Sequence, residues 1–358
     1  MNPRTRRGRH LRTALGILIL AAIVVLAGVV YGGGSPTSER VFILFAINLV
    51  VAIGLQTFMG LTGVVSFGHI AFMGIGAYAA GLLTTSPALK ASSIADAPAF
   101  LRDADVSFLP ATVLAVAFTC LVGLLIGFAI VRLSGTSATI STYALLVIVG
   151  IAIVNLPDLT RGNQTFYGIP KETTVTLAIA FAVAAIAVAR IFQDSRVGLL
   201  LRASREDQLS AAGSGVHVRR YRLYAWVLSI GIVAAGGSLY AHYVTAISPA
   251  AFSLQLTFVV VTMVIIGGRG VSGAFIGAVL VTAINEVMRQ FTGQISIGSI
   301  ETEVGSITPL ILGSIVIAIM VRRPGGLLGD HEIDDLRGPL GRLRARGAKT
   351  AKANATKG

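Results

Sequence analysis

Ten long apolar segments recur along this chain of 358 residues, and they limit its possible folds more than any other feature. An α-helix needs about 20 apolar residues to cross the hydrocarbon core of a bilayer. Only 13% of the residues are charged, whereas soluble domains carry roughly a quarter. The sequence therefore predicts an all-α, polytopic membrane protein with about ten transmembrane segments: 12–31, 41–60, 66–86, 110–131, 138–155, 175–192, 223–246, 253–267, 272–291 and 306–321.

Two of these segments are expected to depart from a regular spanning helix. Segment 253–267 has only 15 residues, so it is predicted to be broken or re-entrant. Segment 66–86 contains four glycines, which can distort or split a helix.

The distribution of basic residues predicts the orientation of the chain. If the N-terminus is cytoplasmic and every segment crosses once, 23 of the 29 lysine and arginine residues fall in inner stretches. Cytoplasmic loops of membrane proteins carry such an excess. Both termini are therefore predicted to be cytoplasmic, and the net charge of +13 reflects topology rather than nucleic-acid binding. The expected divisions are a basic N-terminus at 1–11, a transmembrane domain at 12–323 and a basic cytoplasmic tail at 324–358.

The two ends of the chain need separate interpretation. Five arginines precede the first apolar run, as in some signal peptides, but the run from Thr13 to Val30 is longer than a usual signal core and no A-x-A site follows it. We therefore expect a retained first span. The tail is rich in glycine and alanine and has no apolar period, which predicts disorder close to anionic lipid headgroups.

A glycine-rich break separates the second and third segments. Gly60 and Gly63 end one helix, and Ser66 is expected to cap the next. Broken helices in membranes present free N–H groups and often line a transport route. On this interpretation Gly63, Ser66, Gly68 and His69 belong to a translocation path. The alternative is that the glycines serve only close helix packing.

His69 has two competing interpretations. Ionisable residues within spans are functional candidates. No second titratable residue lies within a helical turn, however, so a neutral histidine with hydrogen-bonded ring nitrogens is the other possibility.

A second glycine-rich break, at 265–278, joins the eighth segment to the ninth. Gly267, Gly268 and Gly270 are assigned to the same translocation path. The sequence loosely echoes residues 60–76, which fits either two related five-span halves or a chance match.

The longest inner loop between spans covers 193–222. Residues 199–212 can form one short helix, ended by Gly213 and Gly215. Its solvated side is expected to carry Arg202, Arg205, Glu206 and Gln208. The next span would be anchored at the inner interface by Arg219, Arg220 and Arg222. The helix can act as a lever for a partner protein, or the whole loop can be a solvated basic stretch.

Motifs for catalysis do not occur. The sequence has no G-x-x-x-x-G-K-[ST] phosphate loop, no HExxH, no paired cysteines and no GxSxG. We therefore expect no enzymatic activity and no cofactor. Cys120, the single cysteine, cannot form an internal disulfide and is expected to be a small buried side chain.

Three stretches together resemble the permeases of branched-chain amino acid ABC importers, of the LivM type. The stretch GLTGVVSFGHIAFMGIGAYAAGLL at 60–83 is similar to a family pattern of G-x-x-G, then S-x-G-H/Q, then G-x-G-A-Y. The second stretch is 202–229, followed by 236–257. The third is 263–278, with the closing RRPGGLLG at 322–329. They occur in the family's order and span nearly the whole chain.

The resemblance implies the ABC importer permease fold, with the permease domain at 12–323 in the bacterial inner (plasma) membrane. Loop 193–222 would dock onto a separate ATPase subunit through the residues that match the family motif: Arg202, Glu206, Asp207, Ala211, Gly215, Arg219 and Arg220. The implied partners are a second homologous permease subunit, two ATP-binding cassette subunits, a periplasmic or extracellular substrate-binding protein and membrane lipid, with no nucleic acid. The implied substrate is leucine, isoleucine or valine, and the partner subunits would hydrolyse ATP.

The sequence departs from the family pattern at two places. Ala212 stands where the coupling segment usually has a glutamate. In 155–170, Arg161, Asn163 and Gln164 largely replace the family's glycines. This difference leaves the exact substrate undetermined but affects the class of transporter less. The alternatives are a permease of a urea or short-amide ABC importer, and a stand-alone secondary transporter or channel, which would not need an ATPase-docking helix.

Overall fold

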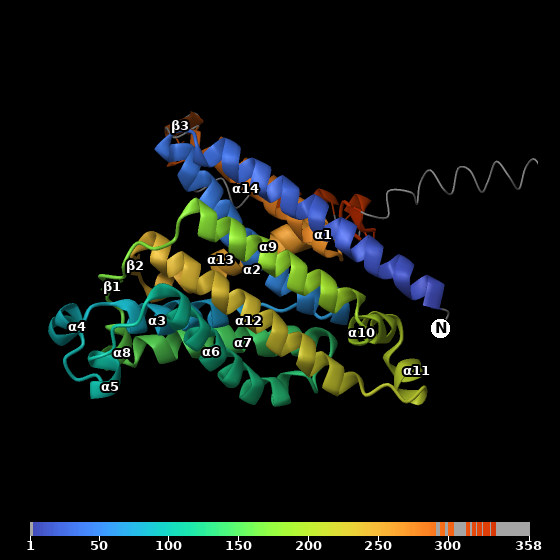
Figure 1. Ribbon diagram of the computed structural model, residues 1–358, viewed down its shortest axis with the longest axis horizontal. Coiled ribbons are helices and arrows are strands. Elements are labelled where there is room, and N and C mark those ends of the chain that lie inside the picture. Colours follow the sequence, from blue (N-terminus) through green and yellow to red (C-terminus); the bar gives the residue numbers. More distant parts are fainter. Residues whose placement is uncertain are drawn as a thin grey trace, which may run out of the picture.

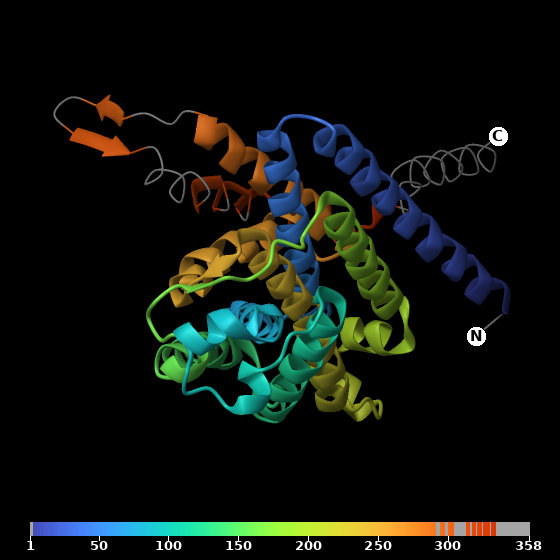
Figure 2. The same cartoon turned by 60° about the vertical axis from the view of Figure 1, so that its left-hand side comes forward.

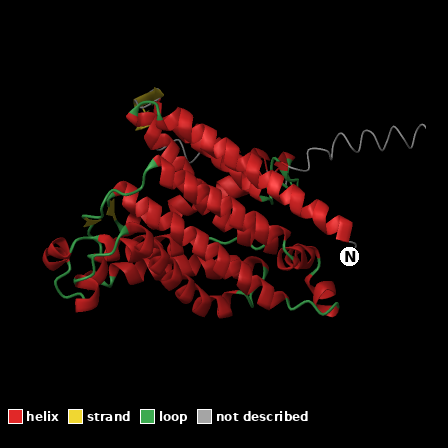
Figure 3. Cartoon of the chain, in the orientation of Figure 1, coloured by secondary structure: helices red, strands yellow, loops and turns green. Residues whose placement is uncertain are grey.

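The computed structural model describes residues 3–290, 294–297 and 300–303, with the short stretches 313–315, 317–319, 321–323, 325–329 and 331–333 (Figure 1). Helices dominate and the strands are short (Figure 3). The elements are α1 (Pro3–Gly32), α2 (Pro36–Thr62), α3 (His69–Thr84), α4 (Pro87–Ser93), α5 (Ala99–Arg102), α6 (Phe108–Ile130), α7 (Gly135–Val154), α8 (Pro157–Thr160), β1 (Phe166–Tyr167), α9 (Val175–Asp194), α10 (Arg196–Glu206), α11 (Gln208–Gly213), α12 (Val218–Val244), β2 (Ala246–Ile247), the 3-10 turn η1 (Pro249–Phe252), α13 (Leu254–Gly267), α14 (Val271–Gln290), β3 (Gln294–Ile297) and β4 (Ile300–Glu303).

The expected all-α, polytopic architecture is confirmed. Within the described residues, eight helices are long and apolar enough to cross a membrane, or nine if the bent pair α3 and α4 counts as one span. The chain turns by 116° between α3 and α4, after Thr84, so the bend lies at the end of segment 66–86. The expected split at its glycines is wrong, because α3 continues unbroken through Gly74, Gly76 and Gly81. Segment 253–267 is short, and only together with η1 does it make a candidate span of 19 residues. Segment 306–321 lies largely outside the described residues.

The helices α2 and α12 form the centre of the bundle. In α2, 83% of the most apolar 18-residue window is buried, and in α12 the share is 61%. In α1 and α6 it is only 28%, and their outer faces expose large apolar side chains such as Leu26, Leu125 and Phe128. A helix that is apolar all round suits lipid or another membrane subunit.

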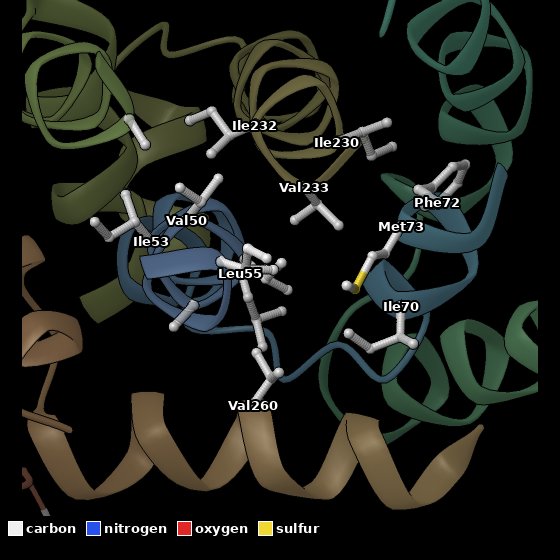
Figure 4. Close-up of a cluster of buried hydrophobic side chains, with 14 of the residues drawn as sticks. Val50, Ile53, Leu55, Ile70, Phe72, Met73, Ile230, Ile232, Val233 and Val260 are labelled. Atoms are coloured by element: carbon white, nitrogen blue, oxygen red, sulfur yellow. The ribbon is translucent and has the colours of Figure 1, made fainter. Parts of the chain in front are cut away.

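Small residues allow the central helices to approach one another closely. Figure 4 shows Val50 of α2, Met73 of α3 and Val233 of α12 pointing into one apolar cluster. A Cβ atom at Gly76 would lie 2.6 Å from the carbonyl oxygen of Ala234 in α12. Real Cβ atoms do not come so close, so the backbones of α3 and α12 are in contact because position 76 has no side chain. Without a hydrophobic driving force between helices in lipid, such contact is a main source of packing energy.

The bundle has two distinct ends. At one end, which we call the coupling end, lie α10 and α11, on the side of the bundle from which α1 starts (Figure 1). At the other, the outer end, α4, α5 and α8 gather, and β1 pairs antiparallel with β2, with Phe166 opposite Ile247. Figure 2 shows β3 and β4 projecting away from the helices. The helix α1 packs along α9, where Thr13 donates a hydrogen bond to Asp194 over 2.8 Å.

Candidate translocation and coupling site

The first break is an extended linker between α2 and α3. The helix α2 ends at Gly63, which has φ 71° and donates its N–H to the carbonyl of Met59. Only glycine adopts this left-handed conformation without strain. A Cβ atom at Gly63 would also lie 2.6 Å from Cγ of Arg205 in α10. The turn therefore depends on glycine for its backbone and for its contact with the loop at 193–222.

The expectation that Ser66 caps α3 is wrong. Gly68 occupies the N-cap position and no side chain caps the helix. The hydroxyl of Ser66 instead lies 2.8 Å from Nδ1 of His69, the first residue of α3. The other ring nitrogen of His69, Nε2, lies 2.9 Å from the hydroxyl of Ser229 in α12.

The hydrogen bonds of His69 define which ring nitrogen carries the proton. The hydroxyl of Ser229 donates to the carbonyl of Trp226, so it accepts from Nε2–H of His69. Nδ1 of His69 then accepts from Ser66. The side chain is 1% exposed and packs against Phe58 and Trp226, with ring centroids 5.5 and 5.1 Å away. This geometry matches the neutral, hydrogen-bonded histidine, which holds α3 against α12.

The second break joins α13 to α14 and is closed by residues from the C-terminal region. Gly268 has φ 118° and ψ −173°, a conformation available essentially only to glycine. A Cβ atom at Gly267 would meet the carbonyl of Gly273, so the two helices pack without space for a side chain. The N–H groups of Leu327 and Leu328 donate to the carbonyls of Ile266 and Gly267, and Arg269 donates its N–H to Gly329.

The closing sequence RRPGGLLG thus supplies backbone partners that the break would otherwise lack. Part of the stretch assigned to the tail at 324–358 therefore packs against the helices. Residues 325–329 and 331–333 pack against α13 and α14, whereas the remainder of the tail lies outside the described residues.

The two breaks touch each other. A Cβ atom at Gly60, in the last turn of α2, would lie 2.6 Å from the carbonyl oxygen of Arg269 in the second break. The same glycine's carbonyl accepts a hydrogen bond of 2.8 Å from Nη1 of Arg205. Three segments distant in sequence therefore meet at Gly60: the end of α2, the α13–α14 turn and α10.

Loop 193–222 differs from its expected structure because it contains two short helices. α10 ends at Glu206 and α11 begins at Gln208. Asp207 lies between them and accepts hydrogen bonds of 2.9 Å from the N–H groups of Leu209 and Ser210. Aspartate is favoured at such an N-cap because its side chain satisfies free N–H groups. The bonds from Ser210 hold the pKa of Asp207 below its ordinary value.

The predicted coupling residues divide into two groups. Exposed to solvent are Glu206, Asp207, Gly215, Arg219 and Arg220, and Ala211 of α11 is half-buried. Arg202 faces the protein, where it donates to the carbonyl of Gln193 over 3.0 Å. Arg205, expected on the solvated side, is instead turned toward α2, with only 13% of its side chain exposed. In the described part of the chain, no group of histidine, cysteine, aspartate or glutamate side chains could hold a metal ion.

Comparison with known proteins identifies the family. Residues 37–321 match the family model described as branched-chain amino acid transport system / permease component. The chain belongs to this family. The high-affinity branched-chain amino acid transport system permease protein LivM of Escherichia coli (strain K12) is 25% identical over 346 residues, covering 87% of this chain and 74% of that protein. LivM of Salmonella typhimurium has the same identity and coverage.

A solved inward-facing structure of a metal-chelate type ABC transporter is more distant. It is 15% identical with a TM-score of 0.43, covering 86% of this chain and 98% of that one. A likeness at this level adds nothing to the family assignment.

Sequence reasoning missed two features of this permease. One is the contact of Arg205 with Gly60, because helical periodicity places Arg205 on the same side as Glu206 and Arg202. The other is the packing of residues 325–329 and 331–333, because the resemblance covered only the closing motif at 322–329. The density of glycines in 322–329 was the available signal, because glycine clusters mark places where backbones approach closely.

Proposed function

We propose that this permease is the membrane-spanning subunit of an ABC importer that moves leucine, isoleucine and valine across the bacterial inner membrane. Membership of the permease family supports the class of protein. The names of the LivM relatives support the substrate class. Hydrolysis of ATP would belong to separate subunits, because the chain has no phosphate-binding loop of its own.

The orientation that fits this function places both termini and the coupling end in the cytoplasm. The excess of lysine and arginine on that side supports it. The outer end, with α4, α5 and the β1–β2 pair, would then face the substrate-binding protein.

The observation that carries the proposal is the continuous contact from the exposed α11 to both breaks. α11 and Glu206 present a solvated surface to which an ATPase subunit can bind. Arg205, at the end of α10, bonds the carbonyl of Gly60, which lies against Arg269. Movement of α10 on ATP-driven closure of the ATPase pair would therefore shift both breaks together. A stand-alone secondary transporter has no need for such a linkage.

The two breaks would border the translocation path, but they would not enclose it by themselves. Gly63, Ser66, Gly68 and His69 set the entry of α3, and the second break comprises Gly267, Gly268 and Gly270. The rings of His69 and Trp226 fill the space between α2, α3 and α12. The path is therefore proposed at a surface shared with a second homologous permease, not through the centre of this chain.

The test is purification of the tagged permease from mild detergent, identification of its partners by mass spectrometry, and uptake by the complex in proteoliposomes. Recovery of a Walker-motif ATPase and a second permease, with ATP-dependent uptake of leucine, is expected. Inhibition of uptake by leucine, isoleucine and valine, but not by urea or acetamide, would support branched-chain amino acids as the substrate. The reverse pattern would favour a urea or short-amide importer. Transport by the chain alone without ATP would refute the ABC function.

A further inference from the structure

Glu332 is a buried carboxylate in the C-terminal region, outside the residues assigned to coupling or to the path. Only 7% of its surface is exposed. Oε1 lies 2.9 Å from Nη1 of Arg190 in α9, and Arg190 is itself 2% exposed. Gln193 also donates to Oε1, over 2.6 Å. A buried charge persists only where it is paired and hydrogen-bonded, and this site meets both conditions.

The same carboxylate binds the first turn of α14. The N–H groups of Val271 and Ser272 donate to Oε1 and Oε2 over 3.0 and 3.1 Å. The contact is reciprocal, because Ile333 donates its N–H to the hydroxyl of Ser272. The positive end of a helix dipole favours a carboxylate at this position. We call Arg190, Gln193, Val271, Ser272 and Glu332 the Glu332 clamp.

The Glu332 clamp joins elements that are remote in sequence and adjacent to the proposed coupling machinery. Gln193 lies in the last turn of α9, immediately before α10, and Arg190 lies in the turn before it. Val271 begins α14, immediately after the second break. The segment 327–329 already bonds the carbonyls of that break. Through Glu332, the C-terminal segment therefore links the end of α9 to the start of α14.

Charged groups continue this link into α10. Arg202 of α10 lies 3.5 Å from Asp194, and Asp194 lies 3.7 Å from Arg190. Arg202, Asp194, Arg190 and Glu332 thus form a series of charged contacts from α10 to α14. This route is separate from the contact of Arg205 with Gly60, which acts on α2.

We propose that Glu332 is a positioning residue for energy coupling, which transmits movement of α10 to α14 through the ion-pair series Arg202–Asp194–Arg190–Glu332. The proposal rests on the proposed ABC function. It treats the C-terminal segment as a strut that stays bound through the transport cycle, and it adds a second route of coupling that leads to the α13–α14 break.

The test compares E332Q with the matched control H331Q in the complete importer reconstituted in proteoliposomes. Glutamine keeps the size of the side chain but removes its charge and replaces one acceptor with a donor. His331 is the neighbouring residue, and its side chain is exposed. The measured quantities are ATPase recovered with the permease, basal ATP hydrolysis, and substrate taken up per ATP hydrolysed.

E332Q is expected to retain its ATPase subunits and basal hydrolysis but to lose about tenfold in uptake per ATP, a size typical of coupling changes. H331Q is expected to match the wild type. Uptake per ATP is the deciding quantity because loss of folded protein lowers uptake and hydrolysis together and leaves their ratio unchanged. An unchanged ratio in E332Q would overturn the proposal.

A second variant keeps the proposal testable if E332Q does not accumulate in the membrane. D194N breaks the middle of the series at a residue whose side chain is 20% exposed, where loss of charge is better tolerated. It is expected to lower uptake per ATP in the same direction, and a wild-type ratio would overturn the proposal. Failure of the wild-type permease to recover any ATPase is a different outcome, because it refutes the proposed function and not the strut alone.

Discussion

Nη1 of Arg205 donates a hydrogen bond to the carbonyl oxygen of Gly60, 2.8 Å away and 145 residues earlier in the chain. The carbonyl belongs to the last turn of α2, where intrahelical partners run out. An arginine of α10 therefore bonds a carbonyl at the end of a central helix.

Replacing Arg205 with alanine is expected to uncouple the transporter. The change removes a charge-assisted hydrogen bond worth about 2 kcal/mol between α10 and α2. Uptake per ATP should fall about tenfold while ATPase recovery stays near the wild-type level. R196A is the matched control, because Arg196 begins the same helix and is exposed. Equal uptake per ATP in R205A and R196A would contradict the role of this contact.

Glu206 and Asp207 are expected to contribute to ATPase docking in different ways. E206A removes an exposed charge that also pairs with Arg205 over 2.9 Å, and it should weaken recovery of the ATPase without changing α11. D207A should also loosen α11, because the side chain of Asp207 accepts from two N–H groups of that helix. D207N keeps the capping oxygen and separates the two effects. Normal coupling in the E206A/D207A double variant, at normal insertion, would remove the docking role.

The cap at Asp207 should be insensitive to pH in the physiological range. Hydrogen bonds from Ser210 lower the pKa of Asp207, so its contribution to folding is present above the ordinary aspartate pKa and is lost as pH falls through the lower folded pKa. Hydrogen exchange of Leu209 and Ser210 should therefore show the same protection, after correction for intrinsic rates, from about pH 5 to pH 8. A loss of protection between these values, absent in D207N, would disagree with the lowered pKa.

Adding a side chain at Gly63 or Gly68 is expected to block transport. Gly63 has a positive φ, and a Cβ atom at Gly68 would lie 2.7 Å from the carbonyl oxygen of Thr142 in α7. Each alanine substitution should cost about 1–3 kcal/mol of stability through strain or overpacking. G150A is the control, because Gly150 lies in α7 and an added Cβ would have no atom within 4 Å beyond the neighbouring backbone of its own helix. Thermal unfolding and uptake measure the two effects, and wild-type uptake in G63A and G68A would refute the expectation.

Labelling of single cysteines can test the orientation. In a C120A background, cysteine replaces Phe100 of α5 or Leu209 of α11, whose side chains are 75% and 85% exposed. A membrane-impermeant maleimide should label F100C on intact spheroplasts and L209C only on inverted vesicles. The opposite pattern would reverse the proposed orientation of both termini.

Hydropathy predicted most of the bundle because the thickness of the hydrocarbon core sets the length of an apolar helix. It also located both breaks, since glycines interrupt otherwise apolar runs at Gly63 and Gly268. The division of loop 193–222 at Asp207 was within reach of the sequence, because aspartate competes with the backbone inside a helix and is favoured at its N-cap.

Contacts between distant segments could not be predicted in the same way. The side of α10 that carries Arg205 is solvated in an isolated helix and becomes buried only because the loop folds back onto α2. Glu332 lies 139 residues from its partner Gln193, and the local sequence around it contains other acidic residues with similar properties. The partners of Arg205 and Glu332 depend on how the folded bundle brings distant segments together, and the local sequence around each residue does not determine that.

The backbone bonds between residues 327–329 and the α13–α14 turn also impose an order on biosynthesis. The turn leaves the translocon before the C-terminal segment has been synthesised, so the carbonyls of Ile266 and Gly267 lack their final partners during that interval. Non-helical backbone at the edge of a membrane is tolerated only when its polar groups are satisfied by protein or water. The final backbone bonds of this hairpin therefore await synthesis of Leu327 and Leu328, and a truncation before Leu327 would leave the carbonyls of Ile266 and Gly267 without these two partners.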